Sequence, residues 1–436
     1  MRGIFRSSAR DYANQTNPQR RNAMADFFQN GMITTLHRLN KNGRVHMERE
    51  VEELARTSPI GLVLPALFSE FEGPAMPNIV NRLQRVRYLR RIVLSLDGAS
   101  REQYSFARKS FSCFKTPVTV LWEDGERIQN LFRLLQSNGL YAGPQGKGRG
   151  CWLAFGYLLA EGDCDVLASH DCDILNYDTD LLIRLCYPVV NRNLGFWFCK
   201  GYYARISDQM NGRVTRLFVT PLVRAIQDMT PEIPFLRFLD SFRYVLAGEF
   251  AMDAYLARTI RIPADWGLEM GVLAEVYRNC SLARICQVDV ADRYDHKHQQ
   301  LSENDATQGL QRMTYDVSKS LFRTLAAEGV TFSTDHFRSL MIRYVRSAED
   351  AISRYYADSV LNGLSFDRHS EELAVEVFAS SLNAAARDFI EKTDGLPLIP
   401  NWNRVLSAIP NFFSLLKEAV ALDEAEARPI AVRLSA

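Results

Sequence analysis

The sequence lacks an apolar run long enough to cross a membrane and lacks an apolar leader. Uninterrupted apolar stretches stay below the ~20 residues that a spanning helix needs. Residues 1–21 are polar and rich in arginine, unlike a secretory signal. We therefore expect a soluble, cytoplasmic protein without a membrane partner.

An excess of charge of either sign is also missing. Lys+Arg 52 and Asp+Glu 51 give a net charge of +1, and no basic stripe with interleaved aromatic residues is present, so we expect no nucleic-acid partner. The eight cysteines contain no Cys-X-X-Cys pair. Most lie in apolar stretches, which favours buried free thiols over a zinc site or a disulfide framework.

What the chain does have is length and apolar content in three differently patterned regions. With 436 residues, 47% of them hydrophobic, it can form one large domain and an accessory one. Residues 1–57 are polar and predict helices at 23–39 and 47–56. Residues 58–303 alternate strand-like and helix-like segments. Residues 304–436 predict amphipathic helices near 308–328, 335–362, 371–392 and 402–422, which we interpret as a packing or homodimer scaffold, with a lid over the active site as the alternative.

The alternation in the middle region predicts an α/β fold with a mainly parallel sheet covered on both faces. Strands are expected at 60–67, 91–96, 118–121 and 166–169, and helices at 78–89 and 151–161. Ligands bind beyond the carboxyl ends of such strands. Three segments should meet on that edge, namely Pro65-Ala66-Leu67, Asp97-Gly98 and Asp171-Cys172-Asp173.

Two carboxylates, Asp171 and Asp173, follow the expected strand at 166–169. Residues i and i+2 of a strand share a face, so the pair can hold a hard divalent cation, which can in turn hold a diphosphate. Cys172 between them is expected to turn into the core. The alternative is a solvated strand end or a helix cap.

Two further segments suit anions. Lys147 lies in Gly143-Pro-Gln-Gly-Lys-Gly-Arg-Gly150, just before a helix, where glycines let the backbone approach a charged ligand and the helix start favours a phosphate. Arg213 and Thr215 open the helical stretch 217–227 and can grip a carboxylate or phosphate. The alternatives are a flexible surface turn and a capped helix start with solvated arginines.

Three later residues complete the candidate set. Glu249 and Glu269 stand among apolar neighbours, and Glu269 opens a helical stretch near Trp266. An acid in that position can bind sugar hydroxyls or stabilise positive charge, or it can be a charge that the helix dipole favours. His296 follows the expected strand 284–290 and can complete the metal site, or it can belong to a polar loop.

Taken in order, these blocks resemble the retaining glucosyl-3-phosphoglycerate synthases and their mannosyl relatives. The resemblance runs from about residue 62 to residue 301. It rests on Val63-Leu-Pro-Ala-Leu67 with Glu70 and Glu72, Leu96-Asp97-Gly98, Gly146-Lys147-Gly148, Asp171-Cys-Asp173, Lys200-Gly-Tyr-Tyr-Ala-Arg205 as a following strand, Gly212-Arg213-Val214-Thr215, Gly248-Glu249-Phe250, Gly267-Leu268-Glu269 and His296. Phe68-Ser69 and Asp97-Gly98-Ala99 depart from the family's more usual Asp-Glu and Asp-Ser-Gly.

The resemblance implies a GT-A fold, with N-terminal helices and an all-helical C-terminal extension added in this chain. It implies metal-dependent transfer of glucose from a nucleotide sugar, by expectation UDP-glucose, to the 2-hydroxyl of 3-phosphoglycerate with Mg²⁺ or Mn²⁺. Mannose, another small acceptor such as glycerate or glycerol, and a non-catalytic sugar-nucleotide-binding scaffold are the alternatives. The implied residues are, for the donor, Pro65, Ala66, Leu67, Glu70, Asp97, Lys147 and Asp171; for the acceptor, Gly212, Arg213 and Thr215; for the metal, Asp171, Asp173 and His296; and for the reaction, Asp173, Glu249 and Glu269.

Overall fold

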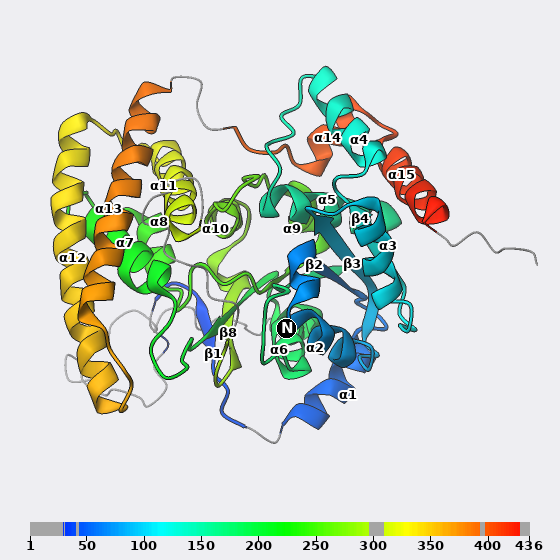
Figure 1. Ribbon diagram of the computed structural model, residues 1–436, viewed down its shortest axis with the longest axis horizontal. Helices are drawn as coiled ribbons and strands as arrows, with labels where there is room; N and C mark the ends of the chain where they lie inside the picture. The colour runs from blue at the N-terminus through cyan, green and yellow to red at the C-terminus, as the bar shows by residue number, and fades with distance from the viewer. Residues whose placement is uncertain (1–28, 30, 41–42, 296–308, 393–396, 428–436) are drawn as a thin grey trace, which may run out of the picture. The chain divides into compact units, whose positions relative to one another are not determined.

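An eight-stranded sheet of order β1-β8-β6-β7-β5-β2-β3-β4 lies at the centre of the computed structural model (Figure 1). The described residues are 29, 31–40, 43–295, 309–392 and 397–427. Those from Gly31 onward belong to one unit, and the other unit, Met1–Asn30, contributes only Gln29. The strands are β1 (Thr34–Leu36), β2 (Ile60–Leu67), β3 (Leu89–Asp97), β4 (Val118–Trp122), β5 (Val166–Ser169), β6 (Phe198–Tyr203), β7 (Phe250–Asp253) and β8 (Ile285–Ala291).

The sheet is parallel apart from β7, which runs antiparallel to both β5 and β6. This confirms the expected mainly parallel sheet. The carboxyl ends of β2, β3 and β5 lie on one edge, as the alternating pattern predicted. Because β7 is reversed, its beginning reaches that same edge.

Helices cover both faces because the strands alternate their side chains between two cores. Val63 of β2 packs into one core, whereas Leu62 and Leu64 pack into the other. On the Val63 face lie α4 (Glu126–Ser137) and α5 (Lys147–Glu161); on the opposite face lie α1 (Arg44–Leu54), α2 (Ala75–Leu83), α3 (Arg101–Ser110) and α6 (Thr179–Val190). Short helices are η2 (Phe68–Glu72), η3 (Arg192–Leu194), α9 (Ala254–Thr259) and η5 (Leu282–Arg284).

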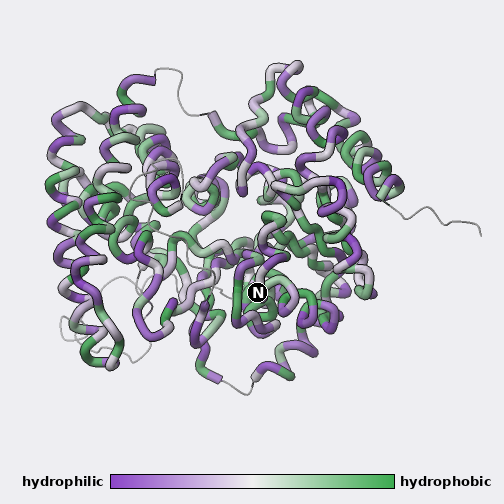
Figure 2. Tube along the Cα trace, in the orientation of Figure 1, coloured by the Kyte–Doolittle hydropathy of each residue, from purple (hydrophilic) through white to green (hydrophobic). Residues whose placement is uncertain are grey.

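A helical layer extends the Val63 face. It contains η4 (Val214–Val219), α7 (Thr220–Gln227), α8 (Pro234–Asp240), α10 (Leu268–Asn279), α11 (Gly309–Ala327), α12 (Thr334–Leu361) and α13 (Arg368–Glu391). Phe218 of η4 contacts Tyr344 of α12 and Phe378 of α13. The yellow helix α12 therefore lies against α7, and the orange helix α13 lies against α11, α12 and η4 (Figure 1). Their hydrophilic and hydrophobic residues alternate along the tube (Figure 2), as the amphipathic pattern predicted.

The last two helices also pack on the Val63 face, against α4, α5 and α9 and away from α12 and α13 (Figure 1). α14 (Trp402–Ala408) and α15 (Phe412–Glu426) replace the single helix expected at 402–422, and they meet at 97°. Trp402 stacks on Trp152 of α5 with ring centroids 4.0 Å apart. In the described part of the chain no single helix is long and apolar enough to cross a membrane, although α14 and α15 taken together have the required length and composition.

Several expected boundaries are wrong. The helix predicted at 78–89 is Ala75–Leu83, and Leu89 already begins β3. The helix predicted at 23–39 is replaced at Thr34–Leu36 by β1, which pairs with β8. β-Branched Ile33, Thr34 and Thr35 favour a strand, and the Gln287 side chain fixes it by donating to Thr35 Oγ1 at 2.9 Å. The helix expected from residue 151 begins at Lys147 instead.

Candidate active site

The reversed strand β7 brings two acidic segments together. Ser169, the last residue of β5, pairs with Phe250, the first residue of β7. Asp171 therefore leaves the sheet beside Gly248-Glu249. A Cβ on Gly248 would lie 2.5 Å from both carboxylate oxygens of Asp171. Only a glycine lets the backbone approach Asp171 this closely.

Lys147 joins Asp171 to Glu269. Its Nζ lies 2.7 Å from Asp171 Oδ1 and 2.8 Å from Glu269 Oε1, and these residues come from the start of α5, the end of β5 and the first turn of α10. Burial alone lowers the pKa of Lys147, but attraction by Asp171 and then Glu269 outweighs it and raises the pKa well above its usual value. Lys147 is thus a fixed cation at a helix N-terminus, where an anion is favoured.

The glycines beside Lys147 are required by close packing. A Cβ on Gly148 would lie 2.1 Å from the carbonyl oxygen of Pro263, and one on Gly146 would lie 3.0 Å from that of Ala264. The turn before α5 is therefore pressed against the segment that leads into α10. This contact sets the distance between Lys147 and Glu269.

Glu249 is fully buried close to Asp171. The hydroxyls of Tyr203 (2.8 Å) and Tyr294 donate to its carboxylate, and the two rings stack 3.7 Å apart. Burial, and next the negative charge of Asp171, raise the pKa of Glu249. The surroundings of Glu249 therefore disfavour its charged form.

Lys200 is a site neighbour that the sequence analysis named only as part of a strand, without a role in the site. It lies in β6 with no exposed surface, and its Nζ donates to the carbonyl oxygen of Ala247 at 2.6 Å. Burial lowers its pKa to about 8, against the opposing attraction of Glu269 and Glu249. A signal was present, because Lys200 is the one charged residue in the strand sequence Phe-Cys-Lys-Gly-Tyr-Tyr.

The expected donor-side residues gather at the ends of β2 and β3. Leu67 pairs with Asp97 and Ala66 with Leu96, while Pro65 precedes them in β2. Half of Leu67 is exposed, and Glu70 follows in η2. The Asp97 carboxylate accepts from the Gly98 amide at 2.8 Å and from the Gln145 side chain.

Glu123 lies beneath this donor-side edge and was not expected. It is buried at the end of β4, where Ser95 Oγ donates to its Oε1 at 2.9 Å. Burial, and then the charge of Asp97, raise its pKa to about 8. The guanidinium of Arg149 lies over the Phe132 ring and adds an opposing attraction.

The expected acceptor-side residues lie at the start of η4 and directly before it. Gly212 has φ +76°, a left-handed backbone that favours glycine. Arg213 Nε donates to Glu371 Oε1 of α13 at 2.7 Å, and Thr215 is buried in η4. A Cβ on Gly212 would lie 3.1 Å from the hydroxyl of Tyr244. The Tyr244 ring contacts the Tyr203 ring, and the Tyr203 hydroxyl donates to Glu249. Two tyrosines therefore connect this loop to Glu249.

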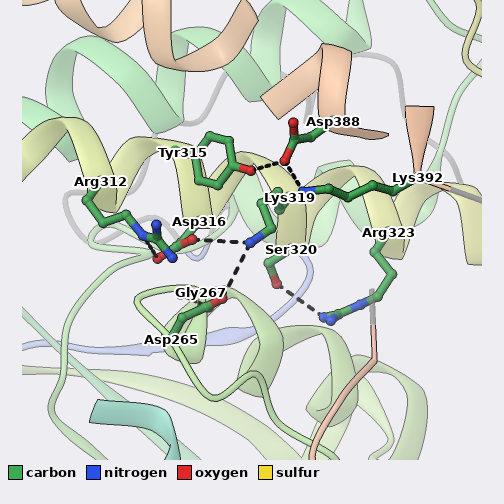
Figure 3. Close-up of polar contacts among 10 residues, drawn as sticks. All are labelled: Asp265, Gly267, Arg312, Tyr315, Asp316, Lys319, Ser320, Arg323, Asp388 and Lys392. Carbon is green, nitrogen blue, oxygen red and sulfur yellow. Dashed lines mark hydrogen bonds and ion pairs between the residues drawn. The ribbon is translucent and has the colours of Figure 1, made fainter. Parts of the chain in front are cut away.

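Helix α11 packs against the loop that precedes Glu269 (Figure 3). Lys319 Nζ lies 3.7 Å from Asp265 and 3.3 Å from the buried Asp316. Burial, and next the charge of Asp265, raise the pKa of Asp316. A Cβ on Gly267 would lie 3.1 Å from Ser320 Cβ, so the loop lies directly on the helix.

The oxygen ligands at Asp171 and Asp173 suit a hard divalent cation. Asp171 and Asp173 supply carboxylate oxygens, which Mg²⁺ and Mn²⁺ prefer. Cys172 is buried, and burial raises its pKa well above its usual value, so it stays a thiol in the core. Within the described ranges no group of three or more His, Cys, Asp and Glu side chains is arranged around a metal. The expected third ligand, His296, lies outside them.

Comparison with known proteins finds full-length relatives. No family model matches. The glucosyl-3-phosphoglycerate synthase of Persephonella marina is 48% identical over 403 residues, which cover 92% of this chain and 100% of the relative. That of Methanococcoides burtonii is 40% identical over 411 residues, which cover 92% and 98%.

Two solved structures share the fold. A glucosyl-3-phosphoglycerate synthase from Mycobacterium tuberculosis, crystallised with Mn²⁺, UDP-glucose and phosphoglyceric acid, matches with a TM-score of 0.50 and 23% identity over 69% of this chain and 89% of that chain. A mannosyl-3-phosphoglycerate synthase from Rubrobacter xylanophilus matches with a TM-score of 0.50 and 21% identity over 66% and 85%. The expected GT-A-like glycosyltransferase fold is confirmed.

Proposed function

This chain belongs to the glucosyl-3-phosphoglycerate synthase family, and from this premise we propose that it transfers glucose from UDP-glucose to the 2-hydroxyl of 3-phosphoglycerate with Mg²⁺ or Mn²⁺. Family membership makes it a glycosyltransferase. The observation that carries the proposal is the contact of Lys147 with Asp171 and Glu269. It joins the diphosphate, metal and sugar positions of the family resemblance in one place.

Each residue has a role that its surroundings support. Lys147 and the first turn of α5 hold the donor diphosphate by charge and backbone amides. Asp171 and Asp173 would hold the cation, with His296 as the proposed third ligand. When bound, the cation neutralises charge that develops on the leaving diphosphate. Pro65, Ala66, Leu67, Glu70 and Asp97 line the nucleotide.

On the acceptor side, Gly212, Arg213 and Thr215 hold the phosphate of 3-phosphoglycerate and place its 2-hydroxyl near the anomeric carbon. Glu249 and Glu269 border the sugar. The bond between the anomeric carbon and the diphosphate oxygen breaks as the bond to the acceptor oxygen forms on the same face. The acceptor proton passes to the diphosphate, and the anomeric configuration is retained.

The contacts of the two glutamates support this route over a covalent glycosyl-enzyme. Both oxygens of Glu249 accept hydrogen bonds from tyrosines. Lys147 holds Oε1 of Glu269, whose buried Oε2 makes no hydrogen bond within the described residues, so Glu269 is the carboxylate on which a covalent adduct has to be tested. Mass spectrometry of the protein incubated with UDP-glucose alone should show no adduct. A glucosyl adduct on Glu249 or Glu269 would replace this mechanism with a double displacement.

A donor-by-acceptor matrix tests the proposed reaction. UDP-glucose and GDP-mannose are each paired with 3-phosphoglycerate, glycerate and glycerol, with and without Mg²⁺. We expect turnover of UDP-glucose with 3-phosphoglycerate only when the cation is present. Binding of UDP-glucose without turnover on any acceptor would refute the proposal.

Arg213 gives the sharpest test of the acceptor site. Removing its guanidinium takes away a charge-assisted contact to the acceptor anion, so Arg213→Ala should raise the KM for 3-phosphoglycerate at least about tenfold while the KM for UDP-glucose changes little. Arg237→Ala is the control, because within the described part of the chain the Arg237 side chain pairs only with the exposed Glu232. An unchanged acceptor KM in Arg213→Ala would move the acceptor site elsewhere.

A further inference from the structure

A carboxylate from the C-terminal helices reaches the proposed acceptor loop. Glu371 lies in the first turn of α13, and only 6% of its side chain is exposed. Its Oε1 lies 2.7 Å from Arg213 Nε, and its Oε2 lies 2.9 Å from Arg216 Nη1. Both oxygens of this single side chain are therefore occupied by arginines that come 155 or more positions earlier in the chain.

Arg216 and Arg213 differ in how many of their guanidinium nitrogens bond to other residues of the fold. Arg216 donates from Nε to the carbonyl oxygen of Asn211 (2.9 Å) and from Nη2 to that of Met210 (3.0 Å), and its guanidinium lies over the Tyr355 ring. With Glu371 on Nη1, all its nitrogens hold the fold together. Arg216 therefore serves the shape of the loop before Gly212.

Arg213 uses only its Nε within the fold. Among the residues that the structure describes, its two terminal nitrogens make no hydrogen bond, and 29% of the side chain is exposed. A guanidinium is planar, so fixing Nε on a buried carboxylate also fixes the direction in which the terminal nitrogens point. Asp367, the N-cap of α13, is close enough for Arg213 to contribute to its lowered pKa, after the stronger effect of its hydrogen bonds with Ser370.

We propose that Glu371 is a positioning residue for acceptor use, which holds the Arg213 guanidinium by its Nε so that the two terminal nitrogens face the acceptor's anionic group. The inference rests on the proposed function. It makes α13 a part of the acceptor site, although no residue of α13 needs to touch the acceptor. Without the carboxylate, Arg213 would regain rotamers that acceptor binding must then restrict.

The test is a kinetic comparison of full-length variants. Glu371→Gln keeps the size of the side chain and removes its charge, and Glu371→Asp keeps the charge on a shorter stem. We expect Glu371→Gln to raise the acceptor KM about tenfold, with kcat and the donor KM within about twofold. Glu371→Asp should lie between it and the wild type, and it carries the test if Glu371→Gln does not fold.

A matched control separates positioning from helix stability. Asp388 lies on the same helix, and among the described residues its carboxylate makes polar contacts only with Tyr315 and Lys392 (Figure 3). Asp388→Asn should leave the acceptor KM unchanged even if it lowers the melting temperature. A similar rise in acceptor KM for Asp388→Asn and Glu371→Gln would show a general packing effect and overturn the proposal.

A double-mutant cycle distinguishes a positioning role of Glu371 from a purely structural one. If Glu371 acts through Arg213, Glu371→Gln should have no further effect on acceptor KM in the Arg213→Ala background. Additive effects would overturn the proposal, as would a lower acceptor KM in Glu371→Gln, which would mean that Glu371 competes with the acceptor.

Failure of the two proposals can be told apart. If Arg213→Ala raises the acceptor KM and Glu371→Gln does not, only the role of Glu371 is refuted. If neither variant changes the use of any acceptor in the matrix, the acceptor site itself is misplaced and both proposals fall.

Discussion

The approach of Gly248 to Asp171 yields a quantitative prediction. A Cβ at position 248 would lie 2.5 Å from both Asp171 oxygens and 2.7 Å from its Cγ. The carboxylate would have to move by roughly 1 Å to reach an ordinary van der Waals separation. That movement would lengthen the contact with Lys147, which now measures 2.7 Å.

The energetic effect follows from the change in distance. With an effective dielectric constant of about 20, lengthening a charge pair from 2.7 Å to about 3.7 Å weakens its attraction by about 1.7 kcal/mol. Such a difference is about tenfold in a rate or binding constant. Loss of the charge-assisted hydrogen bond adds to it. Gly248→Ala should therefore lower kcat/KM for the donor by at least about tenfold.

The assay measures transfer over a range of UDP-glucose and Mg²⁺ concentrations, together with the melting temperature. The acceptor KM should stay within about twofold, because Arg213 lies on another segment. Gly73→Ala is the control, since a Cβ at that position meets only the carbonyl oxygen of Glu70, at 3.8 Å. Donor and metal dependence in Gly248→Ala equal to those of Gly73→Ala would refute the reasoning.

Three further outcomes are expected. Asp173→Ala should abolish metal-dependent transfer with the fold retained by circular dichroism; full activity would exclude Asp173 from the metal site. Burial raises the pKa of Glu123 from 4.5 to about 8, so the folded state keeps a proton that the unfolded state releases, and stability should fall as pH rises from about 5 to 8. Urea unfolding of Glu123→Gln should lack that fall; an identical slope would contradict it. Trp402→Ala, which removes the stack on Trp152, should lower the free energy of unfolding by roughly 3 to 5 kcal/mol, and a loss below about 1 kcal/mol would mean that α14 contributes little.

The sheet edge was predictable because it depends on local patterns. Apolar runs that end in Pro65-Ala66-Leu67, Asp97 and Asp171 identify strands and their carboxyl ends, and parallel strands align those ends. The family resemblance added Glu249 and Glu269, which residue patterns left ambiguous. Their proximity depends on the antiparallel β7, and short apolar segments carry no signal of strand direction.

Contacts between distant segments were not predictable. Periodicity shows which face of α13 is apolar, but it does not show that Glu371 meets an arginine 158 positions earlier. The same holds for Glu249, whose partner hydroxyls come from β6 and from the segment after β8. Local propensity did contain the signal for β1 in its β-branched residues, and the polar composition of the surrounding region outweighed it.

The C-terminal helices contact the surroundings of the proposed site at three separate points. They are therefore part of its architecture and not an independent addition to the sheet domain. Lys319 of α11 holds the loop before Glu269, Glu371 of α13 holds Arg213, and Trp402 of α14 stacks on α5, whose first residue is Lys147. The residues proposed for the donor, the sugar and the acceptor thus each lie on or next to an element that contacts residues after position 308. A side chain that binds a charged ligand must be fixed before the ligand arrives if binding is not to spend free energy on ordering it. Much of the support for the proposed site is therefore encoded outside the middle region in which the motifs lie.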